Sequence, residues 1–433
     1  MNATISLVIL GIVLFLFVTE WLNPTTVAVL ACVAYVITGV CDFSDAFSGF
    51  SNNIVILVFG IMVVGDAVFE TKLADKIGIL VSHLARNNEM LIIVFSAIVG
   101  GIMSMWLSNT AVIVLFLAII RSICAGGVFQ EKNLSLPISM GAMFGGVCTL
   151  VGSTPQMTTQ SIMSEIAGIE FKLFDFLPVG AILFAVYLLY VLLIGRRLGN
   201  RIWAGREDEP DTRLIEDSHL NEKLVELGEE AEKRPLGMKG IIMIVILVGM
   251  IVSFILEPIP IHMTSSCAAL LCVITGCTSH KHALKNMNWD VLIRLAGCLG
   301  IARALQVSGS TELVADLFER ICGTNVNPTL LLFVVCLLTM IVSNFITNST
   351  AVMIFLPVVL PIVMRLGYSP FTFSLAACYA ANLTFATPLA NAQTALTMVS
   401  GYHFRDYFKY NILLEIFVLA VIVFVVPIIY PFS

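Results

Sequence analysis

The sequence alternates long apolar windows with short polar segments, a pattern that suits a chain whose helices face lipid. A bilayer crossing needs about 20 apolar residues. Of the 433 residues, 58% are hydrophobic and 12% are charged, which are the proportions of a polytopic membrane protein and not of a soluble domain. The windows lie at 4–19, 24–40, 53–69, 91–120, 136–166, 176–195, 240–256, 262–277, 289–305, 329–364, 371–400 and 410–431.

A polar interruption in the window at 91–120 allows two structures. Ser108, Asn109 and Thr110 divide the window into two arms, neither comfortably long enough to cross a bilayer. The segment is then either a hairpin that enters the membrane and turns at these residues, or one tilted helix whose small polar residues pack against neighbours. The window at 329–364 presents the same choice.

The distribution of basic residues favours the hairpins. If residues 196–239 are cytoplasmic and both windows are re-entrant, 18 of the 23 Lys and Arg residues fall in cytoplasmic loops and three in outer loops, as the positive-inside rule requires. Counting either window as one crossing would invert every later loop. We therefore predict ten spans and two hairpins in the plasma (inner) membrane, with both termini outside. Arg294 and Arg303 fall inside a span.

The two halves of the chain contain similar segments at nearly constant offsets. The matched pairs are 46–60 with 283–297 (offset 237), 108–111 with 347–350 (offset 239) and 149–152 with 384–387 (offset 235). A duplicated unit of five spans has an odd number of crossings, so its second copy must be inverted. Inverted repeats with discontinuous helices are typical of secondary transporters.

The predicted fold class is therefore an all-α polytopic membrane protein, built from two inverted five-span units. Each unit contains a re-entrant hairpin and a discontinuous helix. The first repeat spans 1–195, a charged cytoplasmic linker follows at 196–239, and the second repeat spans 240–433.

Four polar breaks supply the predicted chemistry: the two hairpin tips and the interruptions at 149–156 and 384–391. The N-terminus of a half-helix suits an anion, and unwound carbonyls with Ser, Thr and Asn oxygens suit sodium. Neither 91–120 nor 329–364 contains a charged residue or a His. We therefore expect a site with no basic side chain, in which bound sodium balances a dianion. Asp66 and Glu70 are either proton-relay groups or a solvated helix end.

Two segments have apolar residues at helical spacing between charged ones. They are 71–86 and the stretch containing Leu313, Leu317 and Ile321. Each is predicted to be an interfacial helix lying in the membrane plane, or else an extension of the preceding span.

These motifs resemble the divalent anion/sodium symporter family, the transporters of dicarboxylates, citrate and sulfate. The residues that resemble it are Ser-Met-Trp-Leu-Ser-Asn-Thr-Ala (104–111), Thr-Leu-Val-Gly-Ser-Thr-Pro-Gln (149–156), Thr-Asn-Ser-Thr-Ala-Val-Met-Ile-Phe-Leu-Pro (347–357), Phe-Ala-Thr-Pro-Leu (385–389) and the ending at 401–409. The resemblance covers nearly the whole chain. It implies an elevator-type homodimer, with a scaffold at 1–88 and 240–326 and a transport domain at 89–195 and 327–433.

The resemblance also implies two sodium sites and a substrate site. One sodium ion would be bound by Ser104, Ser108, Asn109 and Gly152, and the second by Ser343, the carbonyl of Ile346, Asn348 and Ala386. The substrate would contact Ser108, Asn109, Thr110, Thr154, Thr347, Asn348, Ser349, Thr387 and Pro388. Ser-Thr-Pro-Gln and Ala-Thr-Pro-Leu stand where the family has Pro-Pro-Asn, so the substrate's identity stays open.

The function implied is sodium-coupled symport of a small divalent anion, with a dicarboxylate such as succinate or malate as first candidate. Alternatives within the superfamily are a sulfate or citrate carrier, an anion exchanger, and an arsenite or sodium/proton transporter. The expected partners are the anion, sodium ions, the lipid bilayer and a second copy of the chain, with no nucleic acid. An intramembrane enzyme is disfavoured, because the windows hold no buried His and no acid pair. A channel stays open, since polar hairpin tips also build selectivity filters.

Overall fold

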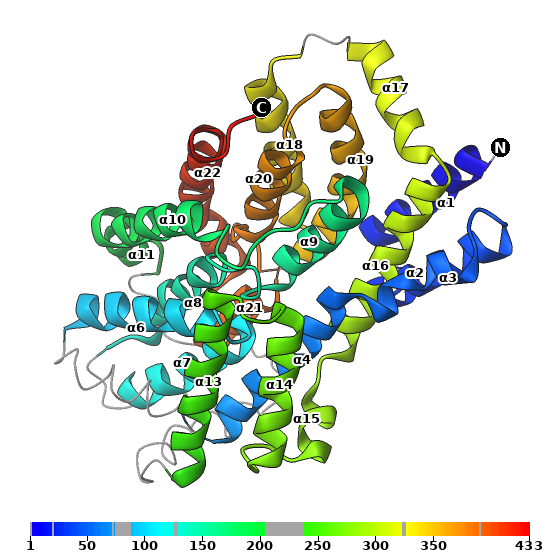
Figure 1. Ribbon diagram of the computed structural model, residues 1–433. Helices are drawn as coiled ribbons and strands as arrows, with labels where there is room; N and C mark the ends of the chain where they lie inside the picture. The colour runs from blue at the N-terminus through cyan, green and yellow to red at the C-terminus, as the bar shows by residue number, and fades with distance from the viewer. Residues whose placement is uncertain are drawn as a thin grey trace.

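The structure is a computed structural model in which every regular element is a helix, over the residues that it describes (Figure 1). Those residues are 2–19, 21–71, 73, 88–124, 129–203, 237–322, 326–388 and 391–433. Five of the described helices are long and apolar enough to cross a membrane: Asn53–Glu70, Leu177–Trp203, Met238–Leu256, Asn348–Arg365 and Phe404–Ile429. The bent pair Trp289–Val307 and Ser310–Leu317 would make a sixth. An all-α polytopic membrane architecture is thus confirmed.

The helices of the first half follow the predicted windows closely. They are α1 (Asn2–Thr19), α2 (Pro24–Ile37), α3 (Phe43–Ala46), α4 (Asn53–Glu70), α6 (Glu89–Ser104), α7 (Asn109–Cys124), α8 (Glu131–Gly146), α9 (Thr154–Ala167), α10 (Leu177–Tyr190) and α11 (Arg196–Trp203). A 3₁₀ turn (Ser48–Ser51) precedes α4, and a π-helical turn (Val191–Gly195) joins α10 to α11. The window at 91–120 is two helices, and the window at 136–166 is broken between α8 and α9.

The second half follows the same order. Its helices are α13 (Met238–Leu256), α14 (Ile261–Ile274), α15 (His280–Asn286), α16 (Trp289–Val307), α17 (Ser310–Cys322), α18 (Pro328–Ser343), α19 (Asn348–Arg365), α20 (Pro370–Asn382), α21 (Ala392–Leu396) and α22 (Phe404–Ile429). A 3₁₀ turn (Thr397–Ser400) follows α21.

The hairpin turns lie slightly earlier in the chain than predicted. The first was expected at Ser108, Asn109 and Thr110, but the chain turns at 105–108 and Asn109 begins α7. In the second, the chain turns at 344–347 and Asn348 begins α19. Asn109 and Thr110, like Asn348 and Ser349, are therefore in the first turn of a helix, whereas Ser108 and Thr347 end the turns before them.

Both ends of the α6–α7 pair lie at one end of the molecule. Contacts join the start of α6, α11, the start of α8 and the end of α7 in a chain: Glu89 to Arg196 (3.4 Å), Trp203 to Asn133 (2.7 Å) and Arg121 to Glu131 (3.1 Å). Ser400, just before α22, donates a hydrogen bond to Glu131 at 2.7 Å. The base of this hairpin therefore lies beside the N-terminal end of α22.

The α18–α19 pair has its base at the other end of α22. Val326 precedes α18 and Tyr368 follows α19, and the Tyr368 hydroxyl donates to the Val326 carbonyl at 2.5 Å. The next residue, Ser369, donates its N–H to the Phe432 carbonyl at 2.7 Å, beyond the C-terminal end of α22. Since α22 has 26 residues and is about 39 Å long, the two hairpins enter from opposite ends. This arrangement supports the predicted inverted repeat.

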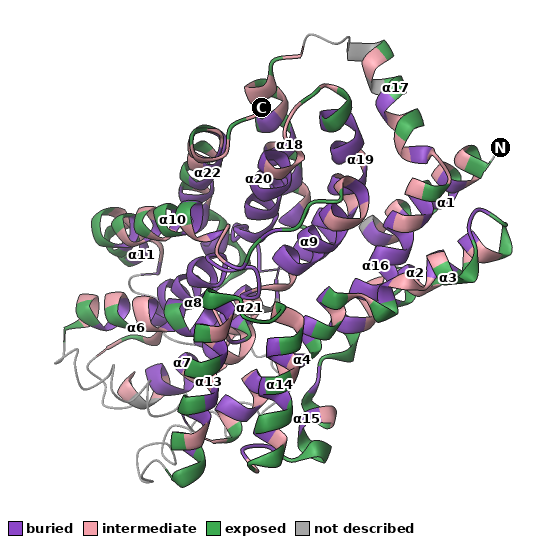
Figure 2. Cartoon of the chain, in the orientation of Figure 1, coloured by how far each residue is buried: buried purple, intermediate pink, exposed green. Residues whose placement is uncertain are grey.

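The buried core is made by the helices that surround the two hairpins. Figure 2 shows α8, α9, α19 and α20 as mostly buried, whereas α10, α13 and α17 carry exposed residues. Close approach of α6 and α8 needs glycine, because a Cβ on Gly145 would lie 2.1 Å from the Cα of Gly101. Small residues at such crossings are how membrane helices pack without a hydrophobic driving force between them.

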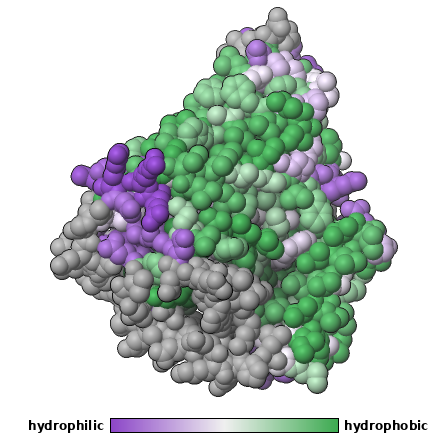
Figure 3. Space-filling view, turned by 90° about the vertical axis from the view of Figure 1, so that its left-hand side faces the viewer, coloured by the Kyte–Doolittle hydropathy of each residue, from purple (hydrophilic) through white to green (hydrophobic). Residues whose placement is uncertain are grey.

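The outer surface is broadly apolar on the face drawn in Figure 3. Exposed apolar side chains include Leu189 and Leu193 of the α10 segment and Phe424 and Ile428 of α22. An extended apolar surface on a chain of this class is what a lipid environment requires.

Of the two predicted interfacial helices, only the second is described. α17 bends away from α16 by 72°, so it is a separate helix and not a straight extension of the span. Its Leu313 and Leu317 are exposed, and its position in the membrane plane stays a prediction. Residues 71–86, apart from 71 and 73, and most of the linker at 196–239 lie outside the described residues.

Candidate functional site

A cavity of about 530 Å³ lies where both hairpin tips, both helix breaks, α4 and α16 meet. This volume falls in the range of small-molecule sites. Its polar lining is Asp66, Ser108, Asn109, Thr110, Ser153, Thr154, Asn286, Asn288, Arg294, Thr347, Asn348, Ser349, Asn382, Asn391 and Gln393. Most of the predicted substrate contacts, from three separate stretches of sequence, are thus on one surface.

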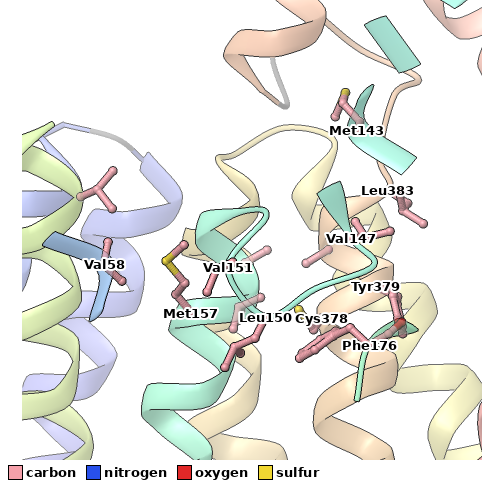
Figure 4. Close-up of a cluster of buried hydrophobic side chains, with 14 of the residues drawn as sticks. Val58, Met143, Val147, Leu150, Val151, Met157, Phe176, Cys378, Tyr379 and Leu383 are labelled. Carbon is pink, nitrogen blue, oxygen red and sulfur yellow. The ribbon is translucent and has the colours of Figure 1, made fainter. Parts of the chain in front are cut away.

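Part of the cavity wall is apolar. Figure 4 shows Val58 on α4 opposite Val151 of the first helix break and Met157 of α9. Behind them, Val147, Leu150 and Cys378 are buried among their neighbours. At Val58, Val151 and Met157 the wall offers no polar partner, so the charged part of a ligand has to face other parts of the lining.

Three helices begin at the cavity: α7 at Asn109, α9 at Thr154 and α19 at Asn348. The first N–H groups of a helix have no partner within it, and each helix N-terminus carries about half a positive charge. In α19 the first intrahelical bond runs from Ala351 to the Thr347 carbonyl, at 3.0 Å. The N–H groups of Asn348 and Ser349 therefore need a partner from outside the helix, and an anion suits them.

The first hairpin tip holds a buried cluster of oxygens. Ser104 and Asn109 are both buried, and the Ser104 hydroxyl contacts Oδ1 of Asn109. Thr149 of the first break donates its hydroxyl hydrogen to the Met105 carbonyl at 2.7 Å. Gly146 also approaches closely, since a Cβ there would lie 2.3 Å from Asn109 Oδ1. Of the predicted sodium ligands, Ser108 and Gly152 line the cavity beside this cluster.

The second tip repeats this arrangement. The Ser343 hydroxyl lies 3.1 Å from Asn348 Oδ1 and 2.7 Å from the Ala381 carbonyl, and Thr384 lies 3.3 Å from the same Asn348 oxygen. Nδ2 of Asn348 donates to the Asn382 carbonyl at 3.2 Å, which directs its oxygen toward Ser343. The Ser–Asn contact thus recurs five residues apart in both tips.

Hydrogen bonds connect the two halves across the cavity. Ser349 of the second tip donates to Thr154 of the first break at 3.0 Å. Asn382 of the second break donates to Ser153 at 2.6 Å and to Gln156 at 3.1 Å. These bonds fix the relative positions of the helix starts that face the ligand.

Six predicted site residues are buried and do not line the cavity: Ser104, Ser343, Ile346, Ala386, Thr387 and Pro388. The Thr387 hydroxyl donates to the Asn344 carbonyl, so it is already engaged. The Ala386 N–H donates to the carboxylate of Glu415 at 2.6 Å. The tip's own first turn, and not the Thr387-Pro388 turn, forms the wall.

The expectation of a site with no basic side chain is wrong. Arg294 of α16 lines the cavity, although both hairpins lack charged residues as predicted. Sequence order separates Arg294 from the nearer tip by more than 50 residues, so only the folded arrangement brings them together. A basic residue inside an apolar window was the available signal.

Asp66 is also on the cavity wall and is not a fully solvated helix end. Its carboxylate accepts a hydrogen bond from Asn286 at 3.0 Å and lies 3.7 Å from His282. His282 also lies 3.8 Å from Glu70. These residues mark the end of the cavity nearest the C-terminus of α4.

Sequence reasoning missed several residues that shape the site. Asn382, Asn391 and Gln393 line the cavity, and Glu415 holds the second helix break from behind. Glu415 gave a signal, because it is an acidic residue inside the apolar window at 410–431. The three amide residues gave none beyond lying in or next to a break.

Comparison with known proteins identifies relatives over the whole chain. The model of a family described as citrate transporter matches residues 14–328 and 320–433. The uncharacterized transporter YfbS of Escherichia coli (strain K12) is 21% identical over 98% of both chains. The sodium-dependent dicarboxylate transporter SdcS of Staphylococcus aureus (strain USA300) is 22% identical over 95% of this chain and 84% of its own.

Solved structures share the fold. MtrF of Neisseria gonorrhoeae, described as illuminating a class of antimetabolite efflux pumps, superposes with a TM-score of 0.62 at 12% identity, over 92% of this chain and 84% of its own. The YdaH transporter of Alcanivorax borkumensis also gives 0.62, at 13% identity, over 92% and 88%. The family match and the relatives SdcS and YfbS confirm the resemblance to the divalent anion/sodium symporters, and the solved structures show the shared fold.

Proposed function

We propose, because the chain belongs to the citrate transporter family, that it carries a small divalent anion by sodium-coupled symport, with a dicarboxylate such as succinate or malate as substrate. The observation that carries the proposal is the meeting of three helix N-termini, at Asn109, Thr154 and Asn348, on one cavity. Unpaired N–H groups and amide side chains bind carboxylate oxygens. Substrate contacts are assigned to Ser108, Asn109, Thr110, Thr154, Thr347, Asn348 and Ser349.

The two Ser–Asn clusters are proposed to hold sodium. Each gathers a hydroxyl, an amide oxygen and nearby carbonyls, with no charged side chain among them, which suits a hard monovalent cation. Bound there, sodium would supply positive charge and connect the tip to the adjacent helix break. The relative SdcS is named as sodium-dependent, which supports this coupling. Ser104, Asn109, Ser343 and Asn348 are the residues assigned to it.

An elevator-type homodimer is proposed, with the scaffold at 1–88 and 240–326 and the transport domain at 89–195 and 327–433. Helix packing supports the division, since α6 to α10 and α18 to α22 pack mainly on one another, as do α2 with α16 and α4 with α14. Contacts of α16 with α9, and of α17 with α19, are where the two parts would slide.

The structure is proposed to represent a state open to the cytoplasm. The cavity lies beside Asp66 and Asn286, which are near the C-terminal end of α4 and the N-terminal end of α16. The predicted topology puts these ends on the cytoplasmic side. Plasma-membrane location and outer termini follow from the same topology and stay predictions.

Uptake into proteoliposomes tests the proposed function. Purified protein would be assayed with labelled succinate, malate, citrate and sulfate, with sodium or choline outside. Saturable uptake of a dicarboxylate that needs sodium is the expected result, and uptake that does not saturate would indicate a channel.

Anion exchange is the second candidate, and Arg294 favours it. A fixed positive charge on the cavity wall can balance part of a dianion without a cation. Uptake in sodium-free choline buffer, driven by an internal anion, would support exchange over symport.

A further inference from the structure

Arg294 occupies an unusual place for a charged residue of a membrane helix. It is five residues from the start of α16, about 8 Å along the helix axis. Val291, one turn earlier on the same face, also lines the cavity. The guanidinium group is therefore carried on the cavity side of α16, opposite the hairpin tips.

Arg294 forms neither a hydrogen bond nor an ion pair with a residue that the structure describes. By contrast, Arg303 on the same helix bonds Asp45 at 3.1 Å, Glu165 at 3.5 Å and Gln306 at 3.1 Å. Asp290, one turn before Arg294, is exposed and attracts it electrostatically, but the two side chains form no ion pair within contact distance. The other charged residue of the described lining, Asp66, is engaged with Asn286.

A charged side chain in a membrane segment is expensive and is normally paired, or marks a ligand path. Arg303 follows the first rule. Arg294 faces the cavity without a partner, so the group that completes its coordination has to come from the solution. Guanidinium has a planar fork of donors that matches a carboxylate or a similar oxyanion.

We propose that Arg294 is a substrate-binding residue that contacts the second acidic group of a dianion, while the helix starts at Asn109 and Asn348 hold the first. This inference rests on the proposed anion transport and names the residue that recognises the second acidic group of the substrate. It also assigns selectivity against monoanions to Arg294. A monoanion bound at the hairpin tips would leave the guanidinium group unpaired, and this would weaken the binding of the monoanion.

The test compares a dianion with a monoanion of the same length. Affinities of succinate and of its monoamide, succinamate, would be measured on purified full-length protein for the wild type, Arg294→Gln and Arg294→Lys. Loss of a charge-assisted bidentate contact should weaken succinate binding by about 10- to 100-fold in Arg294→Gln. Succinamate binding should change by less than about threefold, and Arg294→Lys should fall between, since lysine keeps the charge without the fork.

Arg303→Gln is the matched control, because it removes a positive charge from the same helix but away from the cavity lining. It should keep the wild-type preference for succinate over succinamate. Equal loss of both ligands in Arg294→Gln, or an unchanged preference, would overturn the assignment of Arg294. Should Arg294→Gln fail to fold, Arg294→Lys decides: an unchanged preference there also overturns it. If the wild type binds none of succinate, malate, citrate and sulfate, the proposed function itself is wrong and this inference falls with it.

Discussion

Replacing Glu415 tests whether its carboxylate serves to position the backbone or is needed for its negative charge. Glu415 is 3% exposed on α22. It accepts hydrogen bonds from the N–H groups of Phe385 and Ala386 and, at 3.0 Å, from Nδ2 of Asn344. Nδ2 of Asn411, one turn away, donates to the Phe385 carbonyl at 2.8 Å. The peptide units of the second helix break are thus held by α22.

The two obvious variants should differ strongly in stability. Glu415→Ala leaves the N–H groups of Phe385 and Ala386 without a partner, and each costs about 1–3 kcal/mol, or about 2–6 kcal/mol in total. Nδ2 of Asn344 keeps its hydrogen bond to the Met340 carbonyl at 3.2 Å. Glu415→Gln keeps one carbonyl oxygen for the two N–H groups. The amide group of the introduced glutamine faces Asn344, whose Oδ1 has no hydrogen-bond partner. After the Asn344 side chain rotates, this Oδ1 can accept a hydrogen bond from the amide group. The expected net loss is on the order of 1 kcal/mol.

The stability of each variant would be measured by thermal unfolding in detergent, with the remaining folded protein determined by size-exclusion chromatography. Glu415→Ala should lose most of its folded protein well below the wild-type midpoint, and Glu415→Gln should remain within a few degrees of it. Substrate and sodium binding should survive in Glu415→Gln. A Glu415→Gln protein of wild-type stability that no longer binds sodium would refute this reasoning, because the negative charge itself would then take part in coupling.

Three further results are expected. Asn109→Ala or Asn348→Ala should reduce uptake at least tenfold while the protein still inserts, as membrane fractionation and size exclusion would report; wild-type uptake by both would exclude them from the site. Ser104→Ala or Ser343→Ala should raise the sodium concentration needed for half-maximal uptake more than it raises the substrate concentration at saturating sodium, and the reverse order would contradict the cation sites. A cysteine at Ser218, in a cysteine-free background, should be labelled by an impermeant reagent only after the membrane is opened; labelling in intact cells would invert the topology.

Local sequence was sufficient for the helices and for the places where they break. Gly, Thr and Pro at 149–156, and Thr and Pro at 384–391, interrupt apolar windows, and the structure has breaks there because such residues do not continue a helix well. The tips were predicted from the same logic, with a shift of a few residues. Because Asn109 and Asn348 begin a helix directly after a turn, their N–H groups have no partner within the helix and are available to a ligand.

Tertiary contacts limited what could be predicted about the site. Arg294 was visible in the sequence as a charge inside a span, but nothing in its neighbours indicated that the cavity wall passes through it. The same holds for Asn382, whose partners Ser153 and Gln156 are more than 220 residues earlier in the chain. Conversely, Ala386 and Thr387 are close to the second tip in space, but their polar groups are already engaged. The Ala386 N–H donates to Glu415, and the Thr387 hydroxyl donates to the Asn344 carbonyl.

Arg294 changes what sodium is needed for. A dianion with two full charges meets one guanidinium charge and three helix starts, each equivalent to about half a charge, while the Asp66 carboxylate on the same wall adds one negative charge. With no cation bound, about half a negative charge is therefore left over. Charge balance alone thus requires little sodium, and most of the sodium dependence has to come from the oxygen clusters at the tips. Ser104 with Asn109, and Ser343 with Asn348, each connect the turn of a hairpin to the first residue of the helix that faces the substrate. An ion bound there would fix the orientation of the N–H groups that hold the anion. On this reasoning Arg294→Gln should retain sodium dependence with weakened dianion affinity, and Ser343→Ala should lose sodium affinity while keeping the preference for a dianion over a monoanion.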